Sequence, residues 1–323
     1  SSDVGSGLDA YWYAVGASAG ATDTLDWTDN GLATSTTHTG LSLSDGVTYY
    51  FSVKAVDGAG LESSVISTDG QTADFSGPSA ITAVYDGNAT GTDLDWASKS
   101  NEMYVNWATA TTTDSGSGLA SYWYSMGATS GATDVVDWTE SDANSGIAKI
   151  TDVSLSDYST YYISVIARDN VGNFSATSTS DGFTTDFTNP TPISDLNDGP
   201  GEDIAWSSSS TAVSANWDAA SDTESGIDEY IYSIDKAGGE SVVLWTLTGT
   251  DATFFSHTGL SLEENVKYIV SVISKNGAML VNEGGGVTSN GFRVDISAPS
   301  PIPYVYDGQG VSSDLDFAST PSQ

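Results

Sequence analysis

The sequence predicts an all-β chain built from tandem β-sandwich repeats, and three observations lead to this fold class. A unit of about 110 residues recurs along the chain, apolar residues alternate with a period of two, and clusters of turn residues separate the alternating segments. Alternation with this period is typical of strands that bury one face. No segment shows the capped 3.6-residue periodicity of an amphipathic helix, so strands are expected throughout.

Three sequence anchors define the repeat, and each occurs three times. They are Gly-Leu/Ile-x-x-Tyr-x-Tyr from Gly7, Gly118 and Gly226, Trp-Thr at Trp27, Trp138 and Trp245, and Asp-Gly at Asp86, Asp198 and Asp307. The similar spacing of the three anchors, about 110 residues, indicates one repeated structural unit.

Short Asp-x-x-x-Pro segments at Asp74, Asp186 and Asp295 mark the repeat boundaries, because proline ends one strand segment and begins the next. We therefore predict a partial repeat over residues 1–74 that lacks its first strands. Complete repeats follow over 75–186 and 187–295, and residues 296–323 supply the first strand and loop of a further repeat. Such short links favour an elongated rod over a flexible string of domains.

The strand motifs occur in a fixed order. Trp107 or Trp217 lies on an early strand, Tyr-x-Tyr on the next, and Leu-x-Leu and Tyr-x-Val-x-Val-x-Ala-x-Asn/Asp-x-x-Gly follow. This order resembles the fibronectin type III superfamily, in the variant that forms long tandem arrays in bacterial surface proteins. The resemblance implies a tyrosine corner at Tyr49, Tyr161 and Tyr268, in which the hydroxyl bonds to nearby backbone.

The composition excludes several classes of partner. The 43 Asp and Glu against 8 Lys and Arg give a net charge of -35, which repels nucleic acid and anionic lipid surfaces. The chain has no Cys and no apolar run long enough to span a bilayer, so we expect no direct membrane insertion. With the resemblance to surface proteins, this favours an extracellular or cell-surface location.

The residue inventory predicts that the chain is not an enzyme. His38 and His257 occupy the repeat position that Ile150 fills in another copy, as expected of a structural residue on a strand face. No Ser/His/Asp group can be assembled from such positions. Paired carboxylates are plentiful, but they recur with the repeat instead of marking one cleft.

Acidic loops after the first strand of each unit are candidate calcium sites, because Ca²⁺ takes six to eight oxygen ligands. The candidate ligands are Asp86, Asn88, Asp93 and Asp95, then Asp198, Glu202 and Asp203, then Asp307, Asp314 and Asp316. The alternative is turn capping, since Asp and Asn bond their own backbone in turns. Ca²⁺ is the one cofactor that the sequence indicates.

Two classes of function remain open. A structural stalk or filament-forming segment would repeat its surface in every unit, whereas an adhesin or a carbohydrate-binding accessory module of a secreted enzyme would recognise glycans. The partial first repeat adds an expectation about partners. Either further repeats of a longer chain cover it, or the segment Pro301–Tyr306 of a neighbouring copy inserts beside it, head to tail.

Overall fold

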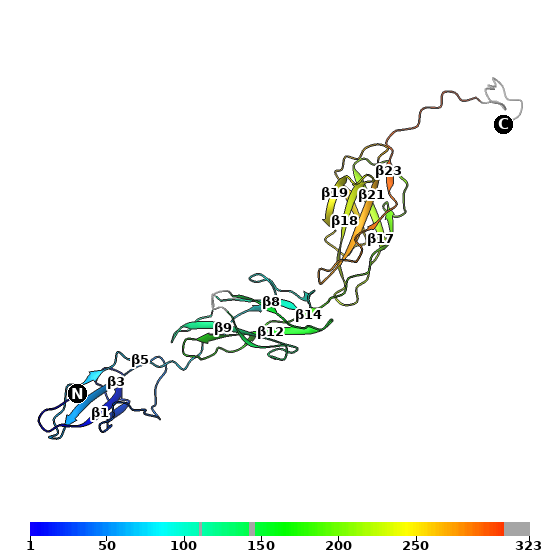
Figure 1. Cartoon of the computed structure of the whole chain (residues 1–323). Coiled ribbons are helices and arrows are strands. Elements are labelled where there is room, and N and C mark those ends of the chain that lie inside the picture. The colour runs from blue at the N-terminus through cyan, green and yellow to red at the C-terminus, as the bar shows by residue number, and fades with distance from the viewer. Residues whose placement is uncertain (110–111, 142–145, 307–323) are drawn as a thin grey trace. The chain divides into compact units, whose positions relative to one another are not determined.

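The computed structural model describes residues 1–109, 112–141 and 146–306 (Figure 1). These residues form strands, turns and loops without any helix, which confirms the prediction of an all-β chain. The described part of the chain accordingly contains no helix that could cross a membrane. The chain divides into two compact units, Ser1–Phe187 and Thr188–Gln323.

The strands between Val84 and Thr185 form a two-layered structure, the second sandwich. One sheet has the order β11-β8-β6, and the other has the order β10-β9-β12-β14-β7, with β13 also paired to β12. The strands are β6 (Val84–Tyr85), β7 (Trp96–Ala97), β8 (Glu102–Trp107), β9 (Leu119–Gly127), β10 (Val136–Ser141), β11 (Ile147–Thr151), β12 (Thr160–Asp169), β13 (Ser178–Thr179) and β14 (Phe183–Thr185). The pairing of β7 with β14 is parallel, and the other pairings are antiparallel.

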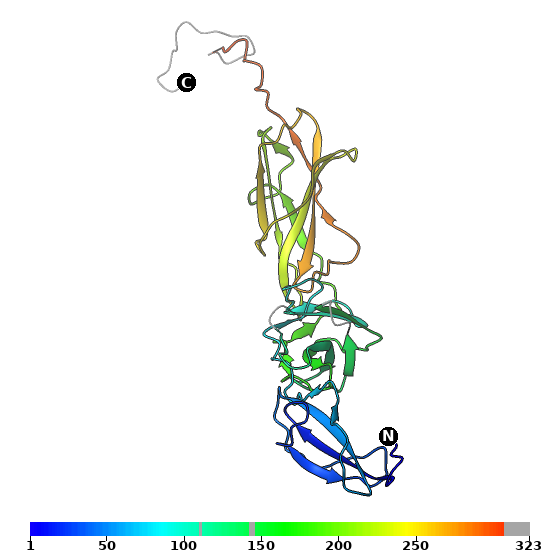
Figure 2. The same ribbon diagram turned by 90° about the vertical axis from the view of Figure 1, so that its left-hand side faces the viewer.

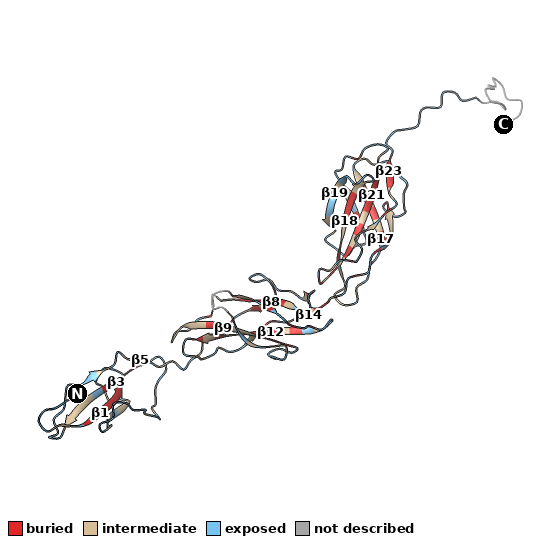
Figure 3. Ribbon diagram, in the orientation of Figure 1, coloured by how far each residue is buried: buried red, intermediate tan, exposed pale blue. Residues whose placement is uncertain are grey.

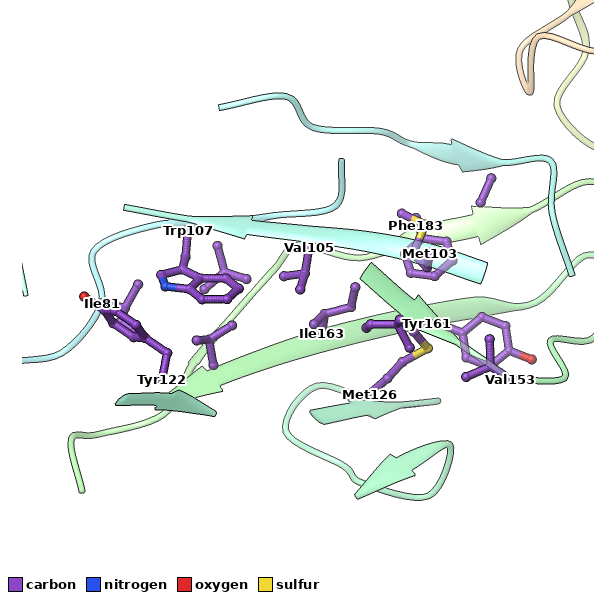
Figure 4. Close-up of a cluster of buried hydrophobic side chains, with 14 of the residues drawn as sticks. Ile81, Met103, Val105, Trp107, Tyr122, Met126, Val153, Tyr161, Ile163 and Phe183 are labelled. Atoms are coloured by element: carbon purple, nitrogen blue, oxygen red, sulfur yellow. The ribbon is translucent and has the colours of Figure 1, made fainter. Parts of the chain in front are cut away.

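The period-two pattern places the core of this sandwich between β8 and β12. Met103, Val105 and Trp107 point from β8 toward Tyr161 and Ile163 of β12, and all five are buried (Figure 4). Because successive side chains on a strand face opposite sides, residues 102, 104 and 106 turn away from this core. The burial colours of Figure 3 show buried positions along β8 and β12.

The strands between Ser194 and Val294 form the third sandwich, which lies in the second unit (Figure 2). Its sheet orders correspond to those of the second sandwich. Its sheets have the orders β15-β17-β20 and β16-β23-β21-β18-β19, with β22 paired to β21. The strands are β15 (Ser194–Asp198), β16 (Trp206–Ser207), β17 (Ala212–Asp218), β18 (Ile227–Lys236), β19 (Ser241–Leu247), β20 (Phe254–Thr258), β21 (Lys267–Asn276), β22 (Val287–Thr288) and β23 (Phe292–Val294).

Residues 1–74 form a single sheet with the order β2-β1-β3-β4 and β5 paired to β3. The strands are β1 (Leu8–Gly16), β2 (Leu25–Asp29), β3 (Thr48–Asp57), β4 (Ile66–Ser67) and β5 (Gln71–Thr72). Phe51 and Val53 are 41% and 42% exposed, whereas Ile163 and Val165 at the equivalent positions of β12 are fully buried. One face of this sheet is therefore only partly covered by the described residues.

Within this chain, the described residues 296–306 pair with no strand. The expected insertion of Pro301–Tyr306 beside a neighbouring copy stays a prediction. The boundaries proposed for the four repeats, including 296–323, stay predictions.

A tyrosine corner is present in each of the three copies, as the sequence predicted. The hydroxyls of Tyr49, Tyr161 and Tyr268 accept hydrogen bonds of 2.8, 2.9 and 2.8 Å from backbone amides five residues upstream. Each bond fixes the loop that leads into the long strand that carries the tyrosine.

Replacing Tyr161 by Phe is expected to destabilise the second sandwich by about 1 to 2 kcal/mol, because the amide of Ser156 loses its acceptor in a partly buried place. Hydrogen exchange of peptides from β9 and β12 measures the change. Tyr162→Phe is the control, since Tyr162 is only half-buried on the opposite face of β12. Equal exchange in the two variants would show that the corner contributes nothing to stability.

Candidate functional site

The candidate site is built around Asp86, which follows directly after β6 and is fully buried. The loop that it begins turns back sharply, so that a side chain on the next residue, Gly87, would put its Cβ 2.2 Å from the carbonyl oxygen of Thr92. Only glycine fits such a close approach of two backbone segments. The repeated Asp-Gly anchor is thus explained by a buried acid followed by a tight loop.

The Asp86 carboxylate has an unusual environment. Burial raises its pKa to about 7, and the negative charges of Asp93 and Asp181 act in the same direction. The Ser180 hydroxyl and the Gly182 amide favour the charged form, but neither makes a hydrogen bond of standard geometry to it. Both carboxylate oxygens are buried without a hydrogen-bond partner among the described residues. An uncompensated buried carboxylate is costly, so this position calls for a counter-charge or a proton.

The loop is held by the side chain of Asn106, a fully buried residue of β8. Its Nδ2 donates to the carbonyl oxygens of Gly87 at 3.1 Å and Thr92 at 2.9 Å, and its Oδ1 accepts from the amide of Gly91 at 2.7 Å. One amide side chain therefore satisfies three backbone groups of the loop. This fixes the distance between Asp86 and the residues at the far end of the loop.

Two exposed acids complete the site. Asp93 lies at the far end of the loop, where its Oδ1 accepts a 3.1 Å hydrogen bond from the amide of Asp86. Asp181 lies in the turn between β13 and β14. One carboxylate oxygen from each of Asp86, Asp93 and Asp181 can lie within 4.8 Å of the other two, so the three acids form a group that could hold a metal ion.

The structure selects among the acids that the sequence proposed for this loop. Asp93 belongs to the same acidic group as Asp86, whereas Asp95 is exposed and is not part of it. The backbone oxygen of Asp95 accepts a hydrogen bond from the amide of Thr184 at 2.8 Å. Asn88 is exposed in the middle of the loop. The third acid of the group, Asp181, was missed by sequence reasoning.

The third sandwich has a related arrangement with one difference in composition. Asp198 is the last residue of β15 and is fully buried, and its amide donates to Oδ1 of Asp203 at 3.2 Å. The position of Asp181 is occupied by Asn290, whose Nδ2 donates to Oδ2 of Asp203 at 2.7 Å. Glu202 is exposed beside these residues. Asp307, Asp314 and Asp316, the third predicted group, lie outside the described residues.

Asp198 is better compensated than Asp86. Its Oδ2 accepts a 2.8 Å hydrogen bond from the amide of Gly291, although Oδ1 has no partner. Burial raises the pKa of Asp198, and Asp203 adds to the increase. Ser289, the Gly291 amide and the positive charge of Lys267 oppose it. The two sandwiches thus share a buried acid but differ in how its charge is balanced.

A second acidic group, Asp74, Asp114 and Asp169, lies at the other end of the second sandwich. Burial alone would raise the pKa of Asp169, but hydrogen bonds from Asn173, Gly172 and Val171 together lower it. Asp74 and Asp114 accept from the amides of Ser117 and Gly118 at 2.6 and 2.5 Å. The hydrogen bonds of these acids to backbone amides are those of residues that cap turns.

Two signals in the sequence pointed to the residues that were missed. Ser180-Asp181-Gly182 and Ser289-Asn290-Gly291 are equivalent triplets, and Asn-Trp recurs at residues 106–107 and 216–217. The Nδ2 of Asn216 donates to the carbonyl oxygen of Gly199 at 3.0 Å, as Asn106 does to Gly87. Aligning the repeats position by position would have shown both pairs.

The two histidines make the same contact in different repeats. Nδ1 of His38 lies 2.9 Å from the hydroxyl of Tyr13, and Nδ1 of His257 lies 2.8 Å from that of Tyr232. Each ring also packs edge-on against its tyrosine. A contact that recurs at equivalent positions is typical of a structural pair.

The chain is similar in sequence to a known protein. No protein-family model matches the chain. Over 237 residues, or 71% of the chain, it is 30% identical to Exoglucanase B of Cellulomonas fimi, and it spans only 20% of that protein's length.

Two solved structures can be superposed on the chain at low similarity. The FN1–FN3 domains of chicken CNTN1 cover 90% of this chain and 91% of their own, with 14% identity and a TM-score of 0.46. The fibronectin(III)-like modules of Clostridium thermocellum CbhA cover 66% of this chain and 93% of their own, with 14% identity and a TM-score of 0.39.

The two β-sandwiches and the tyrosine corners described above are those that the sequence resemblance implies. The chain contains tandem fibronectin type III-like β-sandwich domains, which confirms the resemblance.

Proposed function

We propose that this chain is a non-catalytic accessory array of fibronectin type III-like domains within an extracellular enzyme that acts on a polysaccharide. The observation that carries the proposal is the 30% identity over 237 residues to Exoglucanase B of Cellulomonas fimi. The match covers 20% of that protein, which supports a module of a larger polypeptide. Of the two functions considered from the sequence, this one favours the accessory module over the stalk.

The described acids support a non-catalytic role. A glycosidase needs two carboxyl groups that a sugar can reach on either side of the scissile bond. Asp86 has the raised pKa of a general acid, but its side chain has no exposed surface for a substrate to contact. The histidines are engaged with tyrosine hydroxyls in a contact that two repeats share.

The composition supports an extracellular location. A net charge of -35 keeps the surface strongly hydrated and disfavours association with anionic surfaces. The absence of Cys means that each domain is stabilised by packing and hydrogen bonds without disulfides. Such an array can separate a catalytic domain from its anchoring point.

The second candidate is a stalk or filament segment without an attached enzyme. It is favoured by the recurrence of one fold and one set of loop contacts in successive sandwiches. The accessory array predicts that the polypeptide containing this chain has hydrolytic activity, whereas the stalk predicts that it has none.

Immunocapture of the native polypeptide distinguishes them. Antibodies against the purified chain are used on culture supernatants and surface extracts of cells that carry the gene, and the captured protein is assayed for release of reducing sugar from insoluble glucan. We expect a captured polypeptide larger than 33.4 kDa with hydrolytic activity, while the purified 33.4 kDa chain is inactive. An extracellular polypeptide without such activity would favour the stalk, and hydrolysis by the chain alone would contradict a non-catalytic role.

A further inference from the structure

The buried carboxylate of Asp86 is a feature of the second sandwich that the fold itself does not explain. Both of its oxygens are buried and lack hydrogen-bond partners among the described residues, and the residue is fully buried. Replacing it with an apolar side chain would remove this cost, so its presence suggests a ligand of opposite charge.

Two neighbouring acids, Asp93 and Asp181, add negative charge beside Asp86, and only the neutral Ser180 and Gly182 oppose their effect on its pKa. Oxygens of Asp93 and Asp181 approach within 4.8 Å, and both residues are exposed, which leaves the group open to solvent on one side. None of the ion pairs found in the described ranges 1–109, 112–141 and 146–306 involves these three acids. Three carboxylates that converge without a cationic side chain repel one another.

The third sandwich compensates the equivalent acid in part without a ligand, although Oδ1 of Asp198 has no partner among the described residues. Asn290 replaces one carboxylate and donates to Asp203, the Gly291 amide donates to Asp198, and Lys267 contributes positive charge. The chain therefore contains a group with three carboxylates and an equivalent group with two carboxylates and an amide.

We propose that the second sandwich binds one hard divalent cation, Ca²⁺, between Asp86, Asp93 and Asp181, and that the third sandwich does not bind it because Asn290 stands at the position of Asp181. Carboxylate oxygens are the ligands that Ca²⁺ prefers, and water supplies the remaining ligands on the exposed side. The ion neutralises the buried charge and connects the loop after β6 to the turn before β14. Asp181 was absent from the calcium ligands that the sequence indicated, and Asn88 and Asp95 are not required.

A proton is the competing occupant, because a protonated Asp86 would also relieve the repulsion. The two are separated by working at pH 8, above the pKa of about 7 that burial gives Asp86. The charged form of Asp86 then predominates. Absence of calcium binding at this pH would overturn the proposal.

The test is isothermal titration of CaCl₂ into the full chain after removal of ions with EGTA and dialysis. We expect the wild-type chain to bind Ca²⁺, Asp181→Asn to weaken this binding by at least about tenfold, and Asn290→Asp to add a second site. Both substitutions exchange side chains of the same size in exposed or polar turns, so the fold is expected to remain. Far-ultraviolet circular dichroism and hydrogen exchange of β9 and β18 verify this for each variant.

The location of the ion is tested by hydrogen exchange with and without Ca²⁺. Protection is expected in peptides that contain residues 86–93 and 180–183 of the wild-type chain, and it should vanish in Asp181→Asn. Binding of equal strength in wild type and Asp181→Asn would overturn the site, even if other acidic loops bind calcium. Failure of Asn290→Asp to bind a further ion would overturn the explanation for the third sandwich.

Discussion

Replacing Trp107 by alanine is expected to open the second sandwich while leaving the third intact. Trp107 is 2% exposed and packs on Tyr122 with ring centroids 5.5 Å apart. Truncating a large buried aromatic side chain costs about 3 to 5 kcal/mol, which is a large part of the 5 to 15 kcal/mol that stabilises a typical domain. Hydrogen exchange of peptides from β8, β9 and β12 should accelerate by more than about hundredfold.

The matched control for this variant is Trp123→Ala, one position after the partner Tyr122 on β9. Trp123 is half-buried on the outer side of the sheet, where it meets Phe174 edge-on with ring centroids 6.2 Å apart. Its removal should cost about 1 kcal/mol. Exchange in β18 and β21 of the third sandwich should be the same in both variants, because that sandwich lies in a separate compact unit. Equal losses at the two tryptophans would contradict the core assigned to β8.

Replacing Asn106 by alanine is expected to release the loop after β6 and to abolish the proposed calcium binding without changing any of its ligands. The substitution removes the donor to Gly87 and Thr92 and the acceptor of the Gly91 amide. Each buried backbone group that stays unpaired costs about 1 to 3 kcal/mol, so we expect a loss of about 2 to 4 kcal/mol after partial hydration of the loop. Hydrogen exchange of residues 86–93 and calcium titration measure the two effects.

Asn216→Ala in the third sandwich is the control for the loop. Asn216 donates to Gly199 at 3.0 Å and accepts from the side chain of Asn197 at 3.3 Å, which are fewer contacts with backbone than Asn106 makes. The loss of stability should be smaller, and calcium binding by the second sandwich should not change. Unaltered calcium binding in Asn106→Ala would show that the loop does not depend on this side chain.

The strands and the tyrosine corners were predictable because their signals are local. The alternation of Tyr161, Ile163 and Val165 specifies which face of β12 is buried, and the tyrosine corner joins residues only five positions apart. A strand also needs a neighbour, however. The segment of the first repeat around His38, equivalent to β11, forms no strand because residues 1–74 contain no equivalent of β8.

The site was only half predictable, since its third acid comes from a distant part of the sequence. Asp181 comes close to Asp86 because β14, which follows Asp181, pairs in parallel with β7, which follows the loop of Asp86. Neither the sequence around Asp86 nor that around Asp181 shows this pairing. Asp93 and Asp95 have the same residue type and flank one leucine. The loop conformation that Asn106 stabilises determines which of the two lies beside Asp86. Residue type and spacing do not reveal that conformation.

The parallel pairing of β7 with β14 also determines how a sandwich responds to mechanical tension. The amides of Thr184 and Asp186 donate to the carbonyl oxygens of Asp95 and Ala97 at 2.8 and 3.0 Å. β7 follows the first strand of its sandwich and β14 is the last, so a pull on the two ends of the domain drags these parallel strands in opposite directions. Both bonds are then loaded in shear at the same moment and must break together, whereas an antiparallel hairpin pulled from its open end unzips one bond at a time. The third sandwich has the same parallel pairing between β16 and β23. There the amides of Arg293 and Asp295 donate to the carbonyl oxygens of Ala205 and Ser207 at 2.9 Å each.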